Sequence, residues 1–169
     1  MLTQLYWIDG PWKGKLAISA RPRGGDWLED EISTWRDAGV DLLVSQLTRE
    51  EEVELRLEGE KELALQCGMD FLSFPVPDRE APASFTEALA VYGRIGKALS
   101  DGRKAVVHCR QGIGRAALTA VSLLILKGIS TDEALRIVGH ARGVSVPETA
   151  GQRRWIDDFA ARLIGASAA

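Results

Sequence analysis

Short apolar runs alternate along the chain with longer segments whose apolar positions recur every three or four residues. The short runs are typical of strands, and the longer segments are typical of amphipathic helices. The run at 41–47 is apolar on both faces, as expected for a strand in the middle of a sheet. Strands are predicted at 5–8, 15–19, 41–47, 71–74 and 105–107, the first two joined by a turn at 9–11.

Capping residues indicate where the helices begin and end. Asp26, Thr48 and Ser84 are each followed by glutamate three residues later, which is the pattern of a capping box. Gly39 is expected to end the first helix, and Pro147 suits the first position of the last one. Helices are predicted at 26–39, 48–57, 60–66, 84–99, 116–126, 130–141 and from 147 onward. The inward stripes are expected at Trp27, Leu28, Ile32 and Trp35 in the first helix and at Trp155, Ile156, Phe159 and Leu163 in the last.

This alternation of strands and helices predicts an α/β fold. We expect a single-domain three-layer sandwich, with a mostly parallel central sheet of about four to five strands and helices on both faces. The length suits one domain over residues 1–169, with a core at about 5–164. Because ligands bind at the carboxyl ends of strands in such sheets, the segment after 105–107 is a candidate site.

Composition and charge narrow the function classes. The net charge of −3 argues against nucleic-acid binding, which needs a basic excess. The apolar run at 116–126 is too short to span a bilayer, and the N-terminus lacks a signal-peptide pattern, so no membrane partner is expected. The two cysteines do not form a disulfide framework, which suits a reducing, cytoplasmic setting. Neither metal nor cofactor is expected, because no His/Cys/carboxylate cluster has the spacing of a metal site. We also expect the protein to be a monomer.

The strongest chemical signal is the string His-Cys-Arg-Gln-Gly-Ile-Gly-Arg at 108–115. A loop carrying Gly112 and Gly114 between a strand and a helix is an anion site, because its backbone N–H groups and the helix dipole point at the ligand. That position favours the thiolate form of Cys109. Arg115 at the end of the loop can hold two oxygens of a phosphate. These residues together would place a phosphate over a sulfur nucleophile.

The string resembles the signature His-Cys-x-x-Gly-x-x-Arg of the cysteine-dependent protein tyrosine phosphatases, and it matches at all four fixed positions. The resemblance implies that Cys109 forms a phosphocysteine intermediate and that His108 tunes its thiolate through a local hydrogen bond. The residues expected to bind the phosphate are Arg110, Gln111, Gly112, Ile113, Gly114 and Arg115.

The short chain, the stretch at 19–27 and the Pro-Val-Pro-Asp at 75–78 resemble the compact dual-specificity group of kinase-associated phosphatase type. This resemblance implies hydrolysis of phosphotyrosine and also of phosphoserine and phosphothreonine in proteins. It further implies a general acid on the Pro-rich loop, where Asp78 lies 31 residues before Cys109. Glu80 is the second candidate, and Arg79 between them is placed to contact the substrate. The alternative is that Asp78 is only a turn residue.

Further expectations follow from the same resemblance. Gln152 would orient the hydrolytic water and Arg142 would help to hold its loop, although Gln152 could instead lie on the wet side of a plain amphipathic helix. Ala116 stands where relatives usually have Ser or Thr, which implies slow breakdown of the intermediate. Cys67 either forms a protective disulfide with Cys109 or is a small buried apolar residue.

Three other functions remain open from the sequence. A phosphoinositide or other small phosphoester could be the substrate, although lipid phosphatases of this superfamily tend to carry lysines in the loop, which here offers Arg110. A phospho-binding module would keep the same loop but would lack the nucleophile, the arginine or the acid. A sulfurtransferase also uses a loop cysteine before a helix, but it normally has no acid loop.

Overall fold

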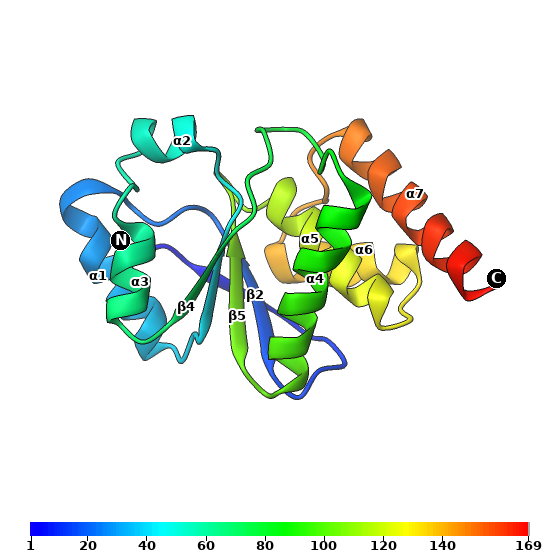
Figure 1. Ribbon diagram of the computed structural model, residues 1–169, viewed down its shortest axis with the longest axis horizontal. Helices are drawn as coiled ribbons and strands as arrows, with labels where there is room; N and C mark the ends of the chain where they lie inside the picture. Colours follow the sequence, from blue (N-terminus) through cyan, green and yellow to red (C-terminus); the bar gives the residue numbers. More distant parts are fainter. Residues whose placement is uncertain (169) are drawn as a thin grey trace.

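A five-stranded sheet forms the middle layer of the computed structural model, which describes residues 1–168 (Figure 1). The strands are β1 (Leu5–Ile8), β2 (Lys15–Ser19), β3 (Leu42–Ser45), β4 (Asp70–Ser73) and β5 (Lys104–His108). Their order is β1-β2-β5-β3-β4; β1 is antiparallel to β2, and the other neighbours are parallel. The structure thus confirms the predicted α/β class and mostly parallel sheet.

Helices cover both faces of this sheet, as Figure 1 shows. The helices are α1 (Leu28–Asp37), α2 (Arg49–Glu54), α3 (Glu60–Gln66), α4 (Phe85–Ser100), α5 (Arg115–Leu126), α6 (Thr131–Arg142) and α7 (Ala150–Ser167). One apolar cluster includes residues of α1 and α3, and the other includes residues of α4 to α7. Among residues 1–168, no helix has the length and apolar character needed to cross a membrane.

The two apolar clusters meet the sheet through alternate residues of each strand. In β5, Ala105 and Val107 belong to the α4–α7 cluster, whereas Val106 belongs to the α1–α3 cluster. All three side chains are buried, as expected when a parallel sheet is covered on both faces. The strand is therefore held rigidly from both sides, and so is the residue at its carboxyl end, His108.

The start of α1 differs from the prediction. Asp26 does not cap the helix; it lies in a 3-10 turn, Gly25–Trp27, and α1 follows at Leu28 without a side-chain cap. Gly25 adopts a left-handed φ of 62°, which lets the chain form this tight turn first. The turn leaves Trp27 56% exposed, so its predicted inward position is wrong. Its ring packs against the Arg23 guanidinium at 4.6 Å instead.

The start of α7 also differs. The helix begins at Ala150 rather than at Pro147, because Thr149 and Gln152 form a reciprocal capping box that satisfies two backbone N–H groups. Gln152 is only 1% exposed, so the alternative that placed it on the wet side of the helix is wrong. α2 is likewise shorter than predicted and ends at Glu54. The predicted N-caps at Thr48 and Ser84 are confirmed.

Candidate active site

The loop at 109–114 connects the carboxyl end of β5 to the first turn of α5. Cys109 is 3% exposed, and its Sγ accepts a hydrogen bond from the Gly112 N–H at 3.2 Å. Gly112 has a φ of 71°, and a Cβ there would lie 2.6 Å from the carbonyl carbon and oxygen of Ser19. Glycine is therefore required for the turn that aims this N–H at the sulfur. α5 starts after Gly114 without a side-chain cap, so its first N–H groups are available to an anion.

Arg115, the first residue of α5, is buried and heavily hydrogen-bonded. Its guanidinium donates to the backbone carbonyls of Gln46 at 3.2 Å and Val76 at 2.7 Å. It also pairs with both carboxylate oxygens of Glu51, at 2.7 and 2.9 Å, and with Asp78 Oδ1 at 2.9 Å. Burial opposes the charged form, but the Glu51 hydrogen bonds and nearby negative charges, including Cys109, outweigh it and raise the pKa of Arg115.

Glu51 is a site residue that the sequence reasoning missed. We predicted it only as part of a capping box, and it does accept from the Thr48 N–H at 3.0 Å. The same carboxylate also binds Arg115, 64 residues further along the chain. Burial would raise the pKa of Glu51, but hydrogen bonds from Arg115 and Thr48 lower it to about 2. The residue is therefore ionised at neutral pH and orients Arg115.

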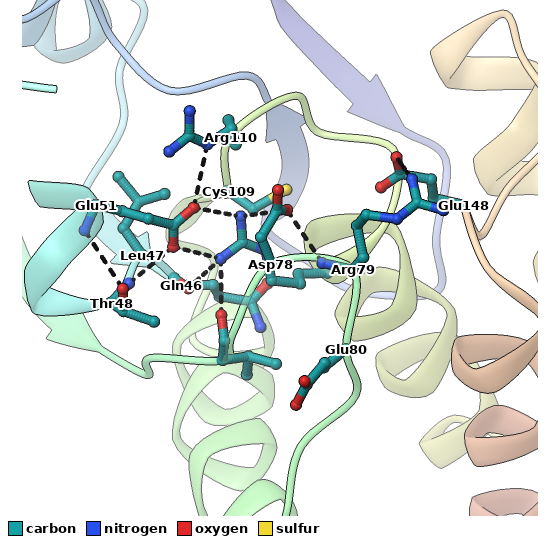
Figure 2. Close-up of polar contacts among 12 residues, drawn as sticks. Gln46, Leu47, Thr48, Glu51, Asp78, Arg79, Glu80, Cys109, Arg110 and Glu148 are labelled. Atoms are coloured by element: carbon teal, nitrogen blue, oxygen red, sulfur yellow. Dashed lines mark hydrogen bonds and ion pairs between the residues drawn. The ribbon is translucent and has the colours of Figure 1, made fainter. Parts of the chain in front are cut away.

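The loop after β4 brings Asp78 beside the same arginine. Figure 2 shows Asp78 near Cys109, whereas Glu80 points away. The Asp78 side chain is 46% exposed and accepts from the Arg79 N–H at 3.1 Å and from Arg115 at 2.9 Å. Of the two carboxylates named from the sequence, only Asp78 contacts Arg115 within residues 1–168. Arg79 directs its guanidinium to Glu148, at 2.7 Å.

The Arg110 side chain leans away from the interior of the loop. Its guanidinium pairs with Glu54 at 2.8 Å. It also pairs with Glu51 at 3.3 Å, the contact drawn in Figure 2. The hydrogen bonds to Glu54 raise the pKa of Arg110 against a smaller effect of burial. Only the backbone of Arg110 is therefore left for a phosphate. The neighbouring Gln111 is exposed, and Ile113 is half-buried.

His108 lies behind the loop and is fully buried. Its Nδ1 is 3.4 Å from the Cys109 carbonyl oxygen, and its Nε2 is 2.8 Å from Oε1 of Glu60. Glu60 is also buried, and the two side chains contact each other on the α1–α3 side of the sheet. This geometry suits a residue that supports the loop, and it holds both ring nitrogens away from a substrate. No local motif marks Glu60 as a partner of His108.

Gln152 and Arg142 both reach the loop. A Cβ on Gly114 would lie 2.9 Å from Gln152 Nε2, which places that amide beside the loop. Gln152 Nε2 donates to the Glu80 carbonyl at 3.1 Å, and its Oε1 accepts from the N–H groups of Glu148 and Thr149. Arg142 donates to the Gln111 carbonyl at 3.1 Å and stacks on Tyr6 at 4.1 Å.

Ala116 and Cys67, two residues singled out in the sequence, were expected to affect the chemistry of the Cys109 thiol. Ala116 is buried in the first turn of α5, and the next hydroxyl on that helix, Thr119, accepts a hydrogen bond from Gln46 Nε2 at 3.0 Å.

Cys67 and Cys109 are both free in residues 1–168. Cys67 precedes β4, whereas Cys109 follows β5, and the parallel register puts them at opposite ends of the strands. A strand of this length separates them by more than the roughly 7 Å between Cα atoms that a disulfide permits.

The assembled site can bind and attack a tetrahedral oxyanion. The uncapped start of α5 and the Arg115 guanidinium supply positive potential above the Cys109 sulfur. Asp78 stands at the rim as a proton donor or acceptor. These parts come from β4, β5, α2 and α5, so the sheet order brings them together.

Comparison with known proteins assigns the chain to a family. Residues 19–129 match the sequence profile of a family described as "Polymorphic toxin system, DSP-PTPase phosphatase". This match covers more than half of the chain, which therefore belongs to that family. The finding confirms the resemblance to the compact dual-specificity protein tyrosine phosphatases.

Individual relatives are more distant. Human cyclin-dependent kinase inhibitor 3 is 25% identical over 138 residues, covering 80% of this chain and 65% of the relative. Its mouse counterpart is 28% identical over 137 residues, covering 80% and 64%. The chain thus spans slightly less than two thirds of the length of these relatives.

Solved structures share the fold. A kinase associated phosphatase with serine at its catalytic cysteine superimposes with a TM-score of 0.88, at 20% identity and 97% coverage of both chains. The active form of Tk-PTP superimposes with a TM-score of 0.77, at 26% identity, covering 94% of this chain and 97% of that one.

Proposed function

We propose that the protein hydrolyses phosphomonoesters of tyrosine, and also of serine and threonine, in phosphorylated proteins through a phosphocysteine. The observation that carries the proposal is that Cys109, Arg115 and Asp78 come together at the carboxyl ends of the strands. Membership of the DSP-PTPase family and similarity to a kinase associated phosphatase support a phosphoprotein substrate. A thiolate nucleophile suits a reducing compartment such as the cytoplasm.

In this proposal, hydrolysis proceeds in two steps. The Cys109 sulfur attacks phosphorus while the bond from phosphorus to the alcohol oxygen breaks, and Asp78 gives its proton to the departing oxygen. Arg115 and the loop N–H groups hold the three remaining oxygens as their charge redistributes. A water then attacks the phosphocysteine, Asp78 takes its proton, and the thiolate leaves. Gln152 lies beside Gly114, where its second amide N–H could orient that water.

Other chemistries fit the site less well. A polyanionic lipid headgroup would need free cations in the loop, but the Arg110 guanidinium is already paired with Glu54 and Glu51. A sulfurtransferase would not need an acid loop, yet Asp78 contacts Arg115. A binding module would not need a nucleophile, yet Cys109 receives the Gly112 N–H.

Hydrolysis of an aryl phosphate tests the proposal directly. The parent enzyme should release the alcohol and phosphate with EDTA present, and Cys109→Ser should lower kcat by ~10⁴-fold or more. Arg115→Lys should be nearly as damaging as Arg115→Ala, because a point charge cannot make the paired contact. Activity that persists in Cys109→Ser would contradict the mechanism. Thiocyanate production from thiosulfate and cyanide would indicate a sulfurtransferase instead.

A further inference from the structure

The loop that carries Asp78 is fastened to the segment between α6 and α7. Arg79 Nη1 pairs with Glu148 Oε1 at 2.7 Å, and the Thr149 hydroxyl donates to the Arg79 carbonyl at 3.3 Å. Gln152 donates to the Glu80 carbonyl at 3.1 Å. These contacts join two short segments about 70 residues apart, directly beside Asp78. The two-step mechanism described above assigns no task to Glu148 or to the Arg79 side chain.

The backbone of Arg79 explains why the loop needs such support. Its φ of 64° lies in the left-handed region, which is unfavourable for a residue other than glycine. The Arg79 N–H points at Asp78 Oδ1, 3.1 Å away, and this bond fixes one carboxylate oxygen. The orientation of Asp78 therefore depends on a backbone conformation that contacts with Glu148 and Thr149 hold in place.

Glu148 also borders the Cys109 loop. A Cβ on Gly114 would lie 3.0 Å from Glu148 Oε2, while Oε1 of the same carboxylate binds Arg79. The Glu148 side chain is 23% exposed, so its charge is partly desolvated and Arg79 is the partner that offsets it. One carboxylate thus binds the loop that carries Asp78 and lies beside the loop that carries Cys109.

We propose that the Arg79–Glu148 ion pair positions Asp78 for proton transfer to the leaving oxygen, with Glu148 as a positioning residue. This inference rests on the proposed function, because it assumes that Asp78 is the acid. Loss of the pair should lower kcat/KM when the leaving group needs a proton, and should change it little when the leaving group does not. In this role Arg79 acts through Glu148 and not through the substrate contact that the sequence suggested.

Variants on both sides of the pair provide the test. Glu148→Gln and Arg79→Ala are compared with the parent using phenyl phosphate, a poor leaving group, and p-nitrophenyl phosphate, a good one. The measured quantity is kcat/KM, which covers the steps up to alcohol release and is insensitive to slow hydrolysis of the intermediate. Each variant should lose about two- to fivefold in kcat/KM with phenyl phosphate, which corresponds to ~0.4–1 kcal/mol and lies within the range of exposed ion pairs. The loss with p-nitrophenyl phosphate should be less than about 1.5-fold.

The design includes rescue and control variants. The double variant should be no worse than either single one, because both remove the same contact. Arg79→Lys keeps the charge and should stay within about twofold of the parent. Glu133→Gln breaks a surface pair with Arg136, 2.6 Å apart on α6, and should leave kcat/KM unchanged for both substrates. Thermal melting of every variant identifies any loss of folding.

Asp78→Asn separates the two levels of the argument. If it shows strong leaving-group dependence while Glu148→Gln and Arg79→Ala affect both substrates equally, or neither, the positioning role is overturned and the proposed function stands. If Asp78→Asn itself affects both substrates equally, Asp78 is not the acid and both proposals are overturned. Selective loss in all three variants supports the positioning role.

Discussion

At the scale of single residues, the orientation of Arg115 depends on Glu51. Two of the hydrogen bonds that the buried guanidinium makes go to this carboxylate, and a third carboxylate contact comes from Asp78. Without Glu51, the buried charge of Arg115 would keep two backbone carbonyls and the half-exposed Asp78 carboxylate as its only partners among residues 1–168. Glu51 thus contributes both to stability and to the geometry of the site.

We predict that Glu51→Gln destabilises the fold by up to ~3 kcal/mol and lowers kcat/KM by ~10- to 100-fold. Because the pKa of Glu51 falls from its ordinary 4.5 to about 2 on folding, its stabilisation is present above pH 4.5. It should fade as the pH falls through about 2. Chemical denaturation of both proteins from pH 7 to pH 2 should show a stability gap that closes at the acid end. A gap independent of pH would contradict the ion-pair interpretation.

Ala116 makes a separate prediction at this scale. Without a hydroxyl in the first turn of α5, and with the Thr119 hydroxyl bound to Gln46, expulsion of the thiolate from the phosphocysteine should be slow. Rapid mixing with an aryl phosphate should show a burst of alcohol followed by a slower steady rate. Ala116→Ser should raise the steady rate and leave the burst rate nearly unchanged. A parent enzyme without a burst, and without any gain from Ala116→Ser, would refute this interpretation.

At the scale of elements, two loops compete for one arginine. The loop after β4 places Asp78 on Arg115, and in the proposed mechanism the same guanidinium must bind the phosphate. An incoming oxyanion therefore meets a carboxylate of like charge at the rim of the site. The capping box of α7 holds the loop that carries Asp78, because Thr149 and Gln152 donate hydrogen bonds to backbone carbonyls of that loop.

This competition predicts tighter oxyanion binding when the carboxylate is removed. Asp78→Asn should lower the inhibition constant of vanadate about three- to tenfold, because a nearby charge of the same sign is gone. Competitive inhibition of residual aryl phosphate hydrolysis provides the measurement. Glu80→Gln removes the same charge from a side chain that points away from the site, and it should leave vanadate binding unchanged (Figure 2). Equal changes in the two variants would indicate a general charge effect.

At the scale of the whole molecule, the site spans both sides of the sheet. Arg115 extends from α5, whose neighbours form the α4–α7 cluster, to Glu51 on α2. His108 sends its ring to Glu60, on the α1–α3 side. The central position of β5, between β2 and β3, makes this possible because its carboxyl end can be reached from both layers. Loss of either layer would therefore disturb the Cys109 loop.

Local patterns were sufficient for most elements and for the centre of the chemistry. β1, β2 and α3 begin and end where the apolar pattern predicts, because their boundaries depend on neighbouring residues. The string at 108–115 identified Cys109, Arg115 and the loop between them, since an anion site at a helix N-terminus is itself a local structure. The errors at Asp26 and Pro147 arose where a tight turn or a competing cap lay within three residues.

Tertiary structure alone decided which distant residues complete the site. The partners of Arg115, His108 and Arg79 are Glu51, Glu60 and Glu148, and each pair joins segments far apart in the chain. In the sequence these three glutamates resemble ordinary helix and turn residues, because no local motif indicates a contact with a distant segment. The sheet order β2-β5-β3-β4 brings these segments together at the carboxyl ends of the strands. The sequence by itself therefore determined the loop that holds the proposed nucleophile at the start of α5, and the packing of the layers determined which distant side chains orient it.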